Sequence, residues 1–199
     1  MSQTVKDPDI REPLFDCLEE KYGQIRILEE KQIGRSRADI LMITQDLIFG
    51  IEIKSDADTY ARLKSQIRDY DRYCDCNYIA AGTRHAQHIA DHVPEWWGII
   101  TAEMIDGIMD FYIVREPKPN PKVKLSGKLA LLWRPELARI QNRCHLPVYR
   151  QKSKKFVQQK ILEKLPAEII SHEIITELME RDYTLIEDEI AAFRKDREK

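Results

Sequence analysis

The sequence predicts an α/β fold with a mixed central sheet, followed by a small helical C-terminal part. Short apolar runs with strand alternation are interleaved with segments that repeat apolar residues every three and four positions. A proline-rich stretch then precedes a region of helical pattern. The 199 residues are 43% hydrophobic and 33% charged, which suits one compact domain plus an appendage.

The predicted elements of the N-terminal part follow in the order helix, three-strand meander, helix, strand, helix, strand and strand. The first helix is expected to begin at Ile10, with Asp9 as its N-cap and Pro13 in its first turn. Further helices are expected over 58–75 and 83–92, and strands over 24–30, 38–44, 47–54, 77–82, 98–102 and 109–114. Helices that connect successive strands predict a mixed sheet with helices on its faces.

Composition divides the chain into three regions. We expect a core over residues 1–115, a stiff connector over 116–125 and a helical region over 126–199. Alternate prolines at positions 117, 119 and 121 make the connector extended. Helices are expected in the last region over 126–142, with a break near Pro135, and over 153–164 and 166–180.

A polar tip at Gln45 and Asp46 joins two of the strands into a predicted hairpin. A two-residue tip fixes the register and sets Asp39 opposite Glu52. Because side chains alternate between the faces of a strand, Glu52 and Lys54 point the same way. Two carboxylates and one ammonium group therefore converge at one end of an apolar sheet, which is costly unless a cation or a substrate completes the cluster.

This cluster has the composition of a magnesium site for phosphodiester hydrolysis. Mg²⁺ prefers hard oxygen ligands and keeps several waters, so Asp39, Glu52 and the carbonyl of Ile53 are its expected ligands, with Mn²⁺ as a substitute ion. Lys54 is expected beside the attacking water or the phosphate, where its charge stabilises the developing negative charge. The competing interpretation is a solvated salt bridge on an edge strand.

The spacing of these residues resembles the PD-(D/E)XK nuclease superfamily, in which an aspartate on one strand is followed by Glu-x-Lys on the next. Residues 37–39 read Arg-Ala-Asp, without the proline that often precedes this aspartate. Gln66 and Tyr70 resemble the Gln-x-x-x-Tyr element of RecB-like members, and the runs 52–56 and 94–98 resemble a stand-alone prokaryotic subfamily. The resemblance implies a restriction-endonuclease-like core and hydrolysis of DNA.

Three further residues are candidates for the same site. The resemblance places a glutamate on the first helix, where Glu12 would reach the metal through water, although the helix dipole also favours a first-turn glutamate. Gln66 and Tyr70 are four residues apart and share one helix face. Gln66 is expected to position the substrate or Lys54, whereas Tyr70 fits that role and a place in the core equally well.

The formal net charge of −2 hides a strong asymmetry. Residues 1–114 carry a net charge of −8, residues 115–160 of +11 and residues 161–199 of −5. A block this basic attracts polyanions, so DNA is the expected partner and RNA an open alternative; a solvated lysine-rich linker is the competing interpretation. The expected nucleic-acid contacts are Lys152, Lys154, Lys155, Arg62 and Arg68.

The remaining features indicate a cytoplasmic protein. No run of about 18 apolar residues occurs and the N-terminal residues are charged, which argues against a membrane span, a membrane partner and a signal peptide. The four cysteines form no Cys-x-x-Cys pair and are expected to be reduced thiols. His85, His88 and His92 have helical spacing but no carboxylate or cysteine partner, so we expect a polar helix face there.

The sequence therefore predicts a Mg²⁺-dependent deoxyribonuclease. A catalytically inactive nucleic-acid-binding module that retains the nuclease fold is the alternative, and a protein-interaction adaptor that uses the C-terminal helices is a third hypothesis. Metal-dependent cleavage separates the first hypothesis from the others, and salt-sensitive DNA binding separates the second from the third. A homodimer is compatible with each of them.

Overall fold

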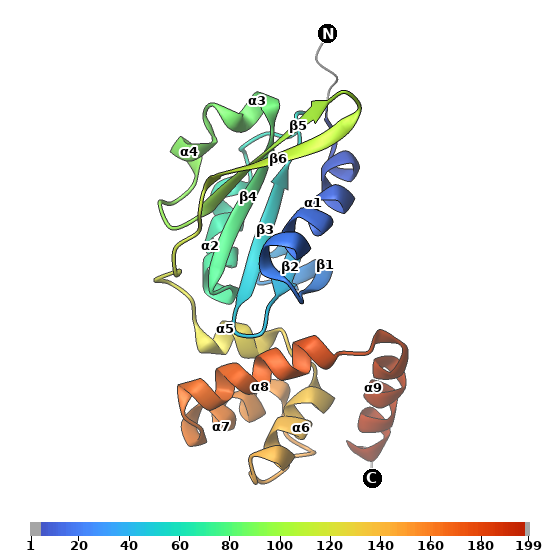
Figure 1. Ribbon diagram of the computed structural model, residues 1–199. Helices are drawn as coiled ribbons and strands as arrows, with labels where there is room; N and C mark the ends of the chain where they lie inside the picture. The colour runs from blue at the N-terminus through green and yellow to red at the C-terminus, as the bar shows by residue number, and fades with distance from the viewer. Residues whose placement is uncertain (1–4, 198–199) are drawn as a thin grey trace. The chain divides into compact units, whose positions relative to one another are not determined.

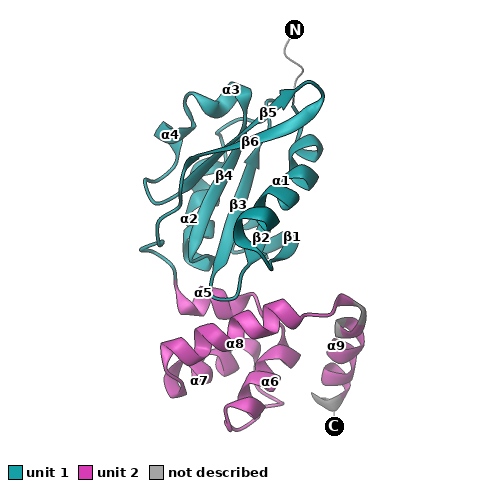
Figure 2. Cartoon of the chain, in the orientation of Figure 1, with its two compact units in different colours: residues 1–123 teal, residues 124–199 magenta. Residues whose placement is uncertain are grey.

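The structure, a computed structural model, describes residues 5–197 and divides the chain into two compact units (Figure 2). Unit 1 spans residues 1–123 and unit 2 spans residues 124–199. Unit 1 combines a sheet with helices and unit 2 is helical, which confirms the predicted α/β class with a helical C-terminal part. Within the described range, no helix is long and apolar enough to cross a membrane.

The sheet of unit 1 has six strands in the order β1-β2-β3-β4-β5-β6 (Figure 1). The strands are β1 (Arg26–Ile33), β2 (Ser36–Ile43), β3 (Ile48–Lys54), β4 (Cys76–Gly82), β5 (Gly98–Ile105) and β6 (Ile108–Arg115). The pairs β3–β4 and β4–β5 are parallel, while β1–β2, β2–β3 and β5–β6 are antiparallel. The expected mixed sheet is therefore correct, and β1 and β5 extend beyond their predicted C-terminal ends.

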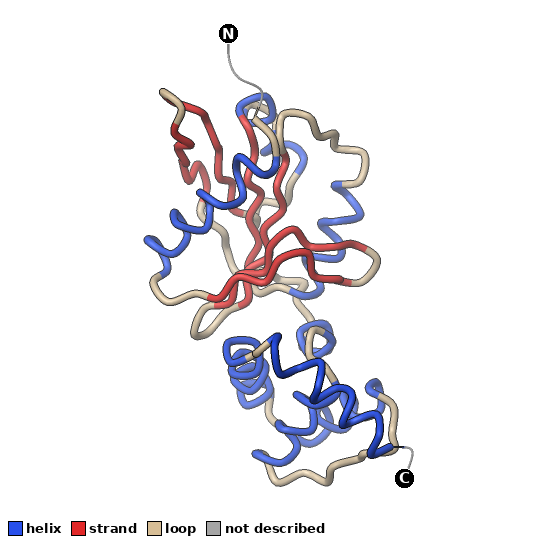
Figure 3. The backbone as a smooth tube through the Cα atoms, turned by 90° about the vertical axis from the view of Figure 1, so that its right-hand side faces the viewer, coloured by secondary structure: helices blue, strands red, loops and turns tan. Residues whose placement is uncertain are grey.

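Helices α1 (Asp7–Tyr22) and α2 (Leu63–Tyr73) lie on opposite faces of this sheet (Figure 1, Figure 3). The alternate β3 residues Ile51 and Ile53 join an apolar cluster with the buried side of α1. On the other face, a Cβ atom added at Gly50 would lie 2.4 Å from the ring of Tyr70 in α2. Even-numbered β3 side chains therefore face α2, and this face receives the charged pair of the predicted site.

The first and second helices begin elsewhere than predicted. α1 begins at Asp7 with Lys6 as its N-cap, and the carboxylate of Asp9 accepts the N–H of Lys6 from inside the first turn at 2.9 Å. Pro13 consequently lies inside the helix. α2 begins at Leu63 because the carboxylate of Asp58 accepts the N–H and hydroxyl of Ser55, at 2.8 and 2.6 Å, and forms a local turn instead of a helix start.

The helix predicted over 83–92 is wrong as a continuous element. It forms two short helices, α3 (Thr83–Ala86) and α4 (Ile89–His92), separated at Gln87 and His88. The N–H of His88 bonds to the carbonyl of His85 at 3.1 Å, a short-range bond that ends the first helix.

The C-terminal part of α2 holds two segments, the turn before β5 through the buried carboxylate of Asp71 and the proline-rich stretch after β6 through backbone carbonyls. The Oδ1 of Asp71 accepts the indole N–H groups of Trp96 at 3.1 Å and Trp97 at 2.8 Å. The side-chain amide of Asn120 donates to the backbone carbonyls of Asp71 and Cys74, both at 2.7 Å. The tryptophan turn and the proline-rich segment are thus held against the C-terminal part of α2.

Unit 2 contains five described helices. They are α5 (Leu125–Ala130), α6 (Arg134–Arg143), α7 (Lys154–Lys164), α8 (Ala167–Glu180) and α9 (Tyr183–Arg197). The predicted break near Pro135 is correct, since Pro135 stands in the first turn of α6 after a turn at 131–133. α7 and α8 begin and end close to the predicted residues, whereas α9 is additional to the prediction.

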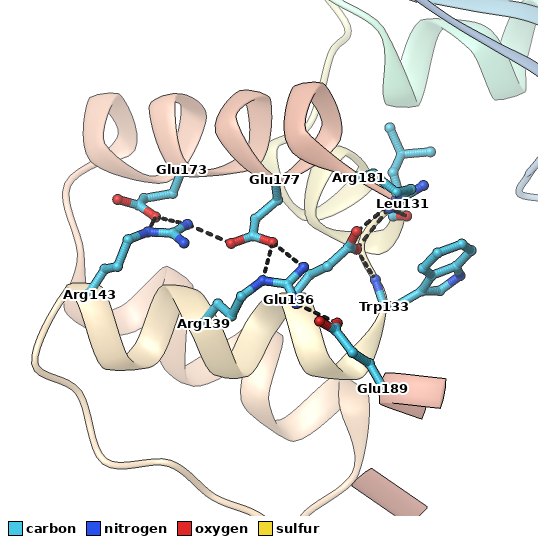
Figure 4. Close-up of polar contacts among 9 residues, drawn as sticks. All are labelled: Leu131, Trp133, Glu136, Arg139, Arg143, Glu173, Glu177, Arg181 and Glu189. Atoms are coloured by element: carbon cyan, nitrogen blue, oxygen red, sulfur yellow. Dashed lines mark hydrogen bonds and ion pairs between the residues drawn. The ribbon is translucent and has the colours of Figure 1, made fainter. Parts of the chain in front are cut away.

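Ion pairs between α6 and α8 reinforce unit 2 (Figure 4). Arg181, directly after α8, makes two bonds to the carboxylate of Glu136, at 2.7 and 2.8 Å, and both side chains are almost completely buried. Glu177 is paired with Arg139 at 2.8 Å and with Arg143 at 2.6 Å. A buried pair is most sensitive to the loss of one partner, because the other charge then stays buried alone.

We predict that Arg181→Ala lowers the free energy of unfolding by about 3–5 kcal/mol, because Glu136 stays buried without its counter-charge. Urea unfolding followed by circular dichroism measures the loss. Arg143→Ala is the matched control: its side chain is 38% exposed and Glu177 keeps Arg139, so the expected loss is about 1 kcal/mol or less. Equal losses in the two variants would contradict the role of burial.

Candidate active site

The hairpin of β2 and β3 has the predicted register. Ile40 pairs with Ile51 and Ile43 pairs with Ile48, which brings Asp39 to the C-terminal end of β3. The carboxylate Oδ2 of Asp39 accepts the N–H of Ile53 at 2.8 Å. Asp39 and Glu52 therefore lie at one end of the hairpin, on the sheet face that α2 covers.

Glu52 and Lys54 form a buried ion pair in this corner. The Lys54 Nζ lies 2.6 Å from Glu52 Oε1, and the two side chains are 7% and 1% exposed. Gln66 of α2 joins them: its amide N–H donates to the same Glu52 oxygen, and its Oε1 accepts from Lys54 at 3.3 Å. The solvated salt bridge that competed with the site in the sequence is thus wrong for this pair, which is enclosed between sheet and helix.

The second oxygen of Glu52 has no partner among the described residues. Oε2 is buried and makes no hydrogen bond with them. A buried carboxylate oxygen without a donor is costly, and a bound cation would satisfy it. In the described part of the chain no group of three or more His, Cys, Asp or Glu side chains could hold a metal ion, so any cation here would depend on the two carboxylates, a backbone carbonyl such as that of Ile53, and water.

Asp39 is a weaker acid than an ordinary aspartate. Burial, reinforced by the nearby negative charge of Glu52, raises the pKa of Asp39 to about 7, against the opposing effects of the Ile53 N–H and of Lys54. The two carboxylates are thus close enough to repel each other. A divalent cation between them would offset this repulsion.

Tyr70 lies in the core and holds the hairpin from the side of α2. It is fully buried, its hydroxyl accepts the N–H of Asp39 at 3.0 Å and donates to the carbonyl of Ile51 at 3.1 Å. Burial also raises the pKa of Tyr70, so the hydroxyl stays protonated as a donor. Of the two interpretations left open by the sequence, the structure favours a place in the core, from which Tyr70 fixes the position of Asp39.

Glu12 does not join the cluster. Its side chain is exposed on α1, and no described contact links it to Asp39 or Glu52. The preceding residue, Arg11, reaches the site instead: its Nη1 donates to the backbone carbonyl of Asp39 at 3.1 Å, while its other nitrogens bond to Asp7. The sequence contained a signal for the Asp7–Arg11 pair in their spacing of four, but none for the contact with Asp39.

An open pocket of about 350 Å³ adjoins Asp39. Its lining residues come from the β1–β2 hairpin and from the start of α2: Gln32, Arg35, Ser36, Arg37, Asp39, Arg62, Ser65 and Gln66. Arg62 was expected at a nucleic-acid interface and lines this pocket, whereas Arg68 is exposed farther along α2 and does not line it. Sequence reasoning missed Arg35 and Arg37, because the β1–β2 hairpin that carries them was not linked to α2 by any local pattern.

The three expected lysines of unit 2 have different surroundings. Lys152 and Lys155 are exposed. Lys154 is partly buried, and its Nζ donates to the carbonyl of Ala130 at the end of α5, at 2.8 Å. Burial lowers the pKa of Lys154. Its ammonium group thus satisfies a helix end inside unit 2, in addition to any role on the surface.

The histidines of α3 and α4 contact a tyrosine. His85 Nδ1 lies 2.8 Å from the hydroxyl of Tyr60, and the ring of His92 stacks on Tyr60 with centroids 3.9 Å apart. His88 is exposed. The cysteines at 17, 74, 76 and 144 form no disulfide within the described part of the chain.

Comparison with known proteins corrects the resemblance drawn from the motifs. A family model described as "Bacteriophage P4 protein cII" matches residues 1–195. The assignment to the PD-(D/E)XK superfamily is therefore wrong: it depended on a few charged residues at strand ends, a pattern that unrelated sheets share, whereas the matching family model extends over nearly the whole chain. No curated protein and no solved structure gives a significant match, so the expected likeness of the core to restriction endonucleases stays a prediction.

We predict that the ionisation of Asp39 destabilises the metal-free fold. Its pKa is about 7 in the fold and ordinarily 3.8, so the folded protein binds this proton more tightly and loses stability as the pH rises from about 4 to about 7. In chelator, Asp39→Asn should raise the thermal midpoint at pH 8 and change it little at pH 4. Asp46→Asn, at the exposed hairpin tip, is the control and should give no such difference. A midpoint for Asp39→Asn that is unchanged at pH 8 would contradict the prediction.

Proposed function

We propose that this chain, which belongs to the bacteriophage P4 protein cII family, hydrolyses phosphodiester bonds in DNA with Mg²⁺ as its cofactor. One observation carries the proposal: a buried glutamate, Glu52, has one oxygen paired with Lys54 and the other without a described donor, beside a second carboxylate with a raised pKa. A purely structural ion pair has no need of the unpartnered oxygen or of the neighbouring acid.

The two oxygens of Glu52 have separate tasks in this proposal. Oε1 holds Lys54 and Gln66, while Oε2 and the carboxylate of Asp39 would hold the cation together with the carbonyl of Ile53. The N–H of Ile53 orients Asp39 by bonding to Oδ2, and Oδ1 makes none of the described hydrogen bonds. When bound, Mg²⁺ supplies a water of lowered pKa and positive charge beside the phosphate.

Lys54 supplies a positive charge from the protein itself at this site. Its ammonium group is fixed by Glu52 and Gln66, so it is already oriented before substrate arrives. A unit charge at 4 Å from a developing negative charge is worth about 4 kcal/mol at an effective dielectric of 20. Lys54 therefore stabilises the negative charge that develops on the phosphate oxygens, and Gln66 acts as a positioning residue for it.

The neighbouring pocket supports a polyanionic substrate. Three arginine side chains line it together with Asp39. A substrate with several phosphates can meet these arginines and the carboxylate corner together, which a small neutral molecule cannot do.

We predict that purified protein cleaves DNA in Mg²⁺ or Mn²⁺ and that chelator stops it. Asp39→Asn and Lys54→Ala should each lower the cleavage rate by about 100-fold or more, because the first removes a ligand of the cation and the second removes the positive charge beside the reacting phosphate. The measurement uses linear, circular, single-stranded and branched DNA, with RNA alongside. Asp46→Asn and Lys64→Ala are the matched controls, since both residues are exposed and neither lines the pocket.

Two outcomes would contradict this function. Cleavage at the wild-type rate in both site variants would mean that the chemistry lies elsewhere or in a contaminant. DNA binding without cleavage in any divalent cation would instead favour the inactive binding module, which retains the fold and the charges but not turnover.

A further inference from the structure

We infer that the pocket beside Asp39 is a phosphate subsite for a polynucleotide, in which Arg35 and Arg62 bind a backbone phosphate next to the one that is cleaved. The inference rests on the proposed phosphodiesterase function and deepens it by naming the residues that hold the substrate. It also moves the main nucleic-acid contact from the basic block of the sequence to unit 1, whose first 114 residues carry a net charge of −8.

Two of the three guanidinium groups that line this pocket are available for a ligand. Arg35 and Arg62 are exposed, and no described contact involves either guanidinium. Arg37 differs, because its Nε lies 2.5 Å from the carboxylate of Glu30, which neutralises part of its charge. A free guanidinium group presents several N–H donors in a plane and pairs with two phosphate oxygens at once.

The backbone that carries Arg35 is fixed before any ligand binds. The carboxylate of Asp69 in α2 accepts the N–H of Arg35 at 3.1 Å and the hydroxyl of Ser36 at 2.7 Å. Gly34 has a positive φ of 60°, and a Cβ atom there would lie 2.7 Å from an oxygen of Asp69. The turn between β1 and β2 is therefore tied to α2, and less conformational entropy is lost when a phosphate binds.

The N-terminal end of α2 adds to the positive electrostatic potential in the pocket. Arg62 is the N-cap of this 11-residue helix, and Ser65 and Gln66 of its first turn line the same pocket. A helix N-terminus favours a nearby anion, with an effect that stays modest at an exposed site. This contribution supports the two arginines, which supply most of the attraction.

Asp39 makes binding depend on a cation. A phosphate in the pocket would lie beside a carboxylate, and the two negative charges repel unless a cation separates them. Divalent ion and polynucleotide should therefore each strengthen the binding of the other by the same factor. This coupling distinguishes the pocket from a general basic surface.

Several basic side chains of the block over residues 115–160 already bind other groups within unit 2. Lys154 bonds to a backbone carbonyl at the end of α5, and Lys160 is 2.6 Å from a glutamate of its own helix. Arg139 and Arg143 both pair with Glu177. These basic side chains of the block thus already have partners inside the unit, whereas the two pocket arginines have no such partner among the described residues.

The test is binding without cleavage, with Ca²⁺ in place of Mg²⁺. Fluorescence anisotropy of a labelled oligonucleotide is measured over a range of salt concentrations, with a nucleoside monophosphate as the second ligand. Arg35→Ala combined with Arg62→Ala should weaken oligonucleotide binding by about tenfold or more and lower the slope of log affinity against log salt by about 1 to 2. Chelator should weaken wild-type binding.

Lys152→Ala combined with Lys155→Ala is the matched control, because it removes the same charge from exposed positions of unit 2. It should change the affinity and the slope much less than the arginine pair does. Arg35→Lys with Arg62→Lys should fall between wild type and the alanine pair, since it keeps the charge but loses the planar donors. Equal thermal midpoints for all variants exclude loss of folding as the cause.

The outcomes separate this inference from the proposed function. Unchanged binding in the arginine variant, or an equal loss in the lysine variant, would overturn the pocket while leaving cleavage to be judged by its own test. Equal affinity for the mononucleotide and the oligonucleotide would overturn the assignment to a polynucleotide. The expected loss of binding in a protein that cleaves nothing would support the pocket and overturn the phosphodiesterase.

Discussion

Glu52 and Lys54 carry opposite charges into the interior of unit 1, and the arrangement around them follows from the cost of burying them. Removing each ion from water costs several kcal/mol, which their mutual attraction offsets only if the geometry is good and the remaining polar atoms are satisfied. Gln66 contributes to that satisfaction from α2. The unpartnered Oε2 is what remains among the described atoms, and it gives this corner its chemical character.

The same pair explains why the hairpin is so well specified. A shift of one residue in the register of β3 would turn Glu52 and Lys54 into the apolar cluster beneath α1. It would also turn Ile51 and Ile53 of β3 toward α2. The two-residue tip and the alternation of side chains therefore predicted the hairpin correctly. The start of α2 was not predictable in the same way, because Asp58 is equally suited to cap a helix and to close the turn with Ser55 that it forms.

The residues of the site also divide into those that the sequence could predict and those that it could not. Asp39, Glu52 and Lys54 could be brought together from sequence, since the hairpin register and the alternation of side chains fix them. Gln66 was linked to them only through the resemblance, and its contacts with Glu52 and Lys54 come from the packing of α2 on the sheet. The Arg35 side of the pocket depends on a bond to Asp69, 34 residues away, and Arg11 on a backbone carbonyl 28 residues away. No periodicity encodes such contacts. The family could not be read from so few residues either, because short charged motifs describe a chemistry that unrelated chains can share, whereas the family match extends over residues 1–195.

Trp96 and Trp97, which both donate to Asp71, provide an intrinsic fluorescence probe of unit 1. Of the chain's three tryptophans, two share this buried carboxylate in unit 1, and the ring of the third, Trp133, lies 4.2 Å from the guanidinium carbon of Arg181 in unit 2. Replacing Trp133 by phenylalanine would leave unit 1 as the source of indole emission. The melting of the two units could then be followed separately in one sample, with peptide ellipticity reporting both and fluorescence reporting the sheet alone.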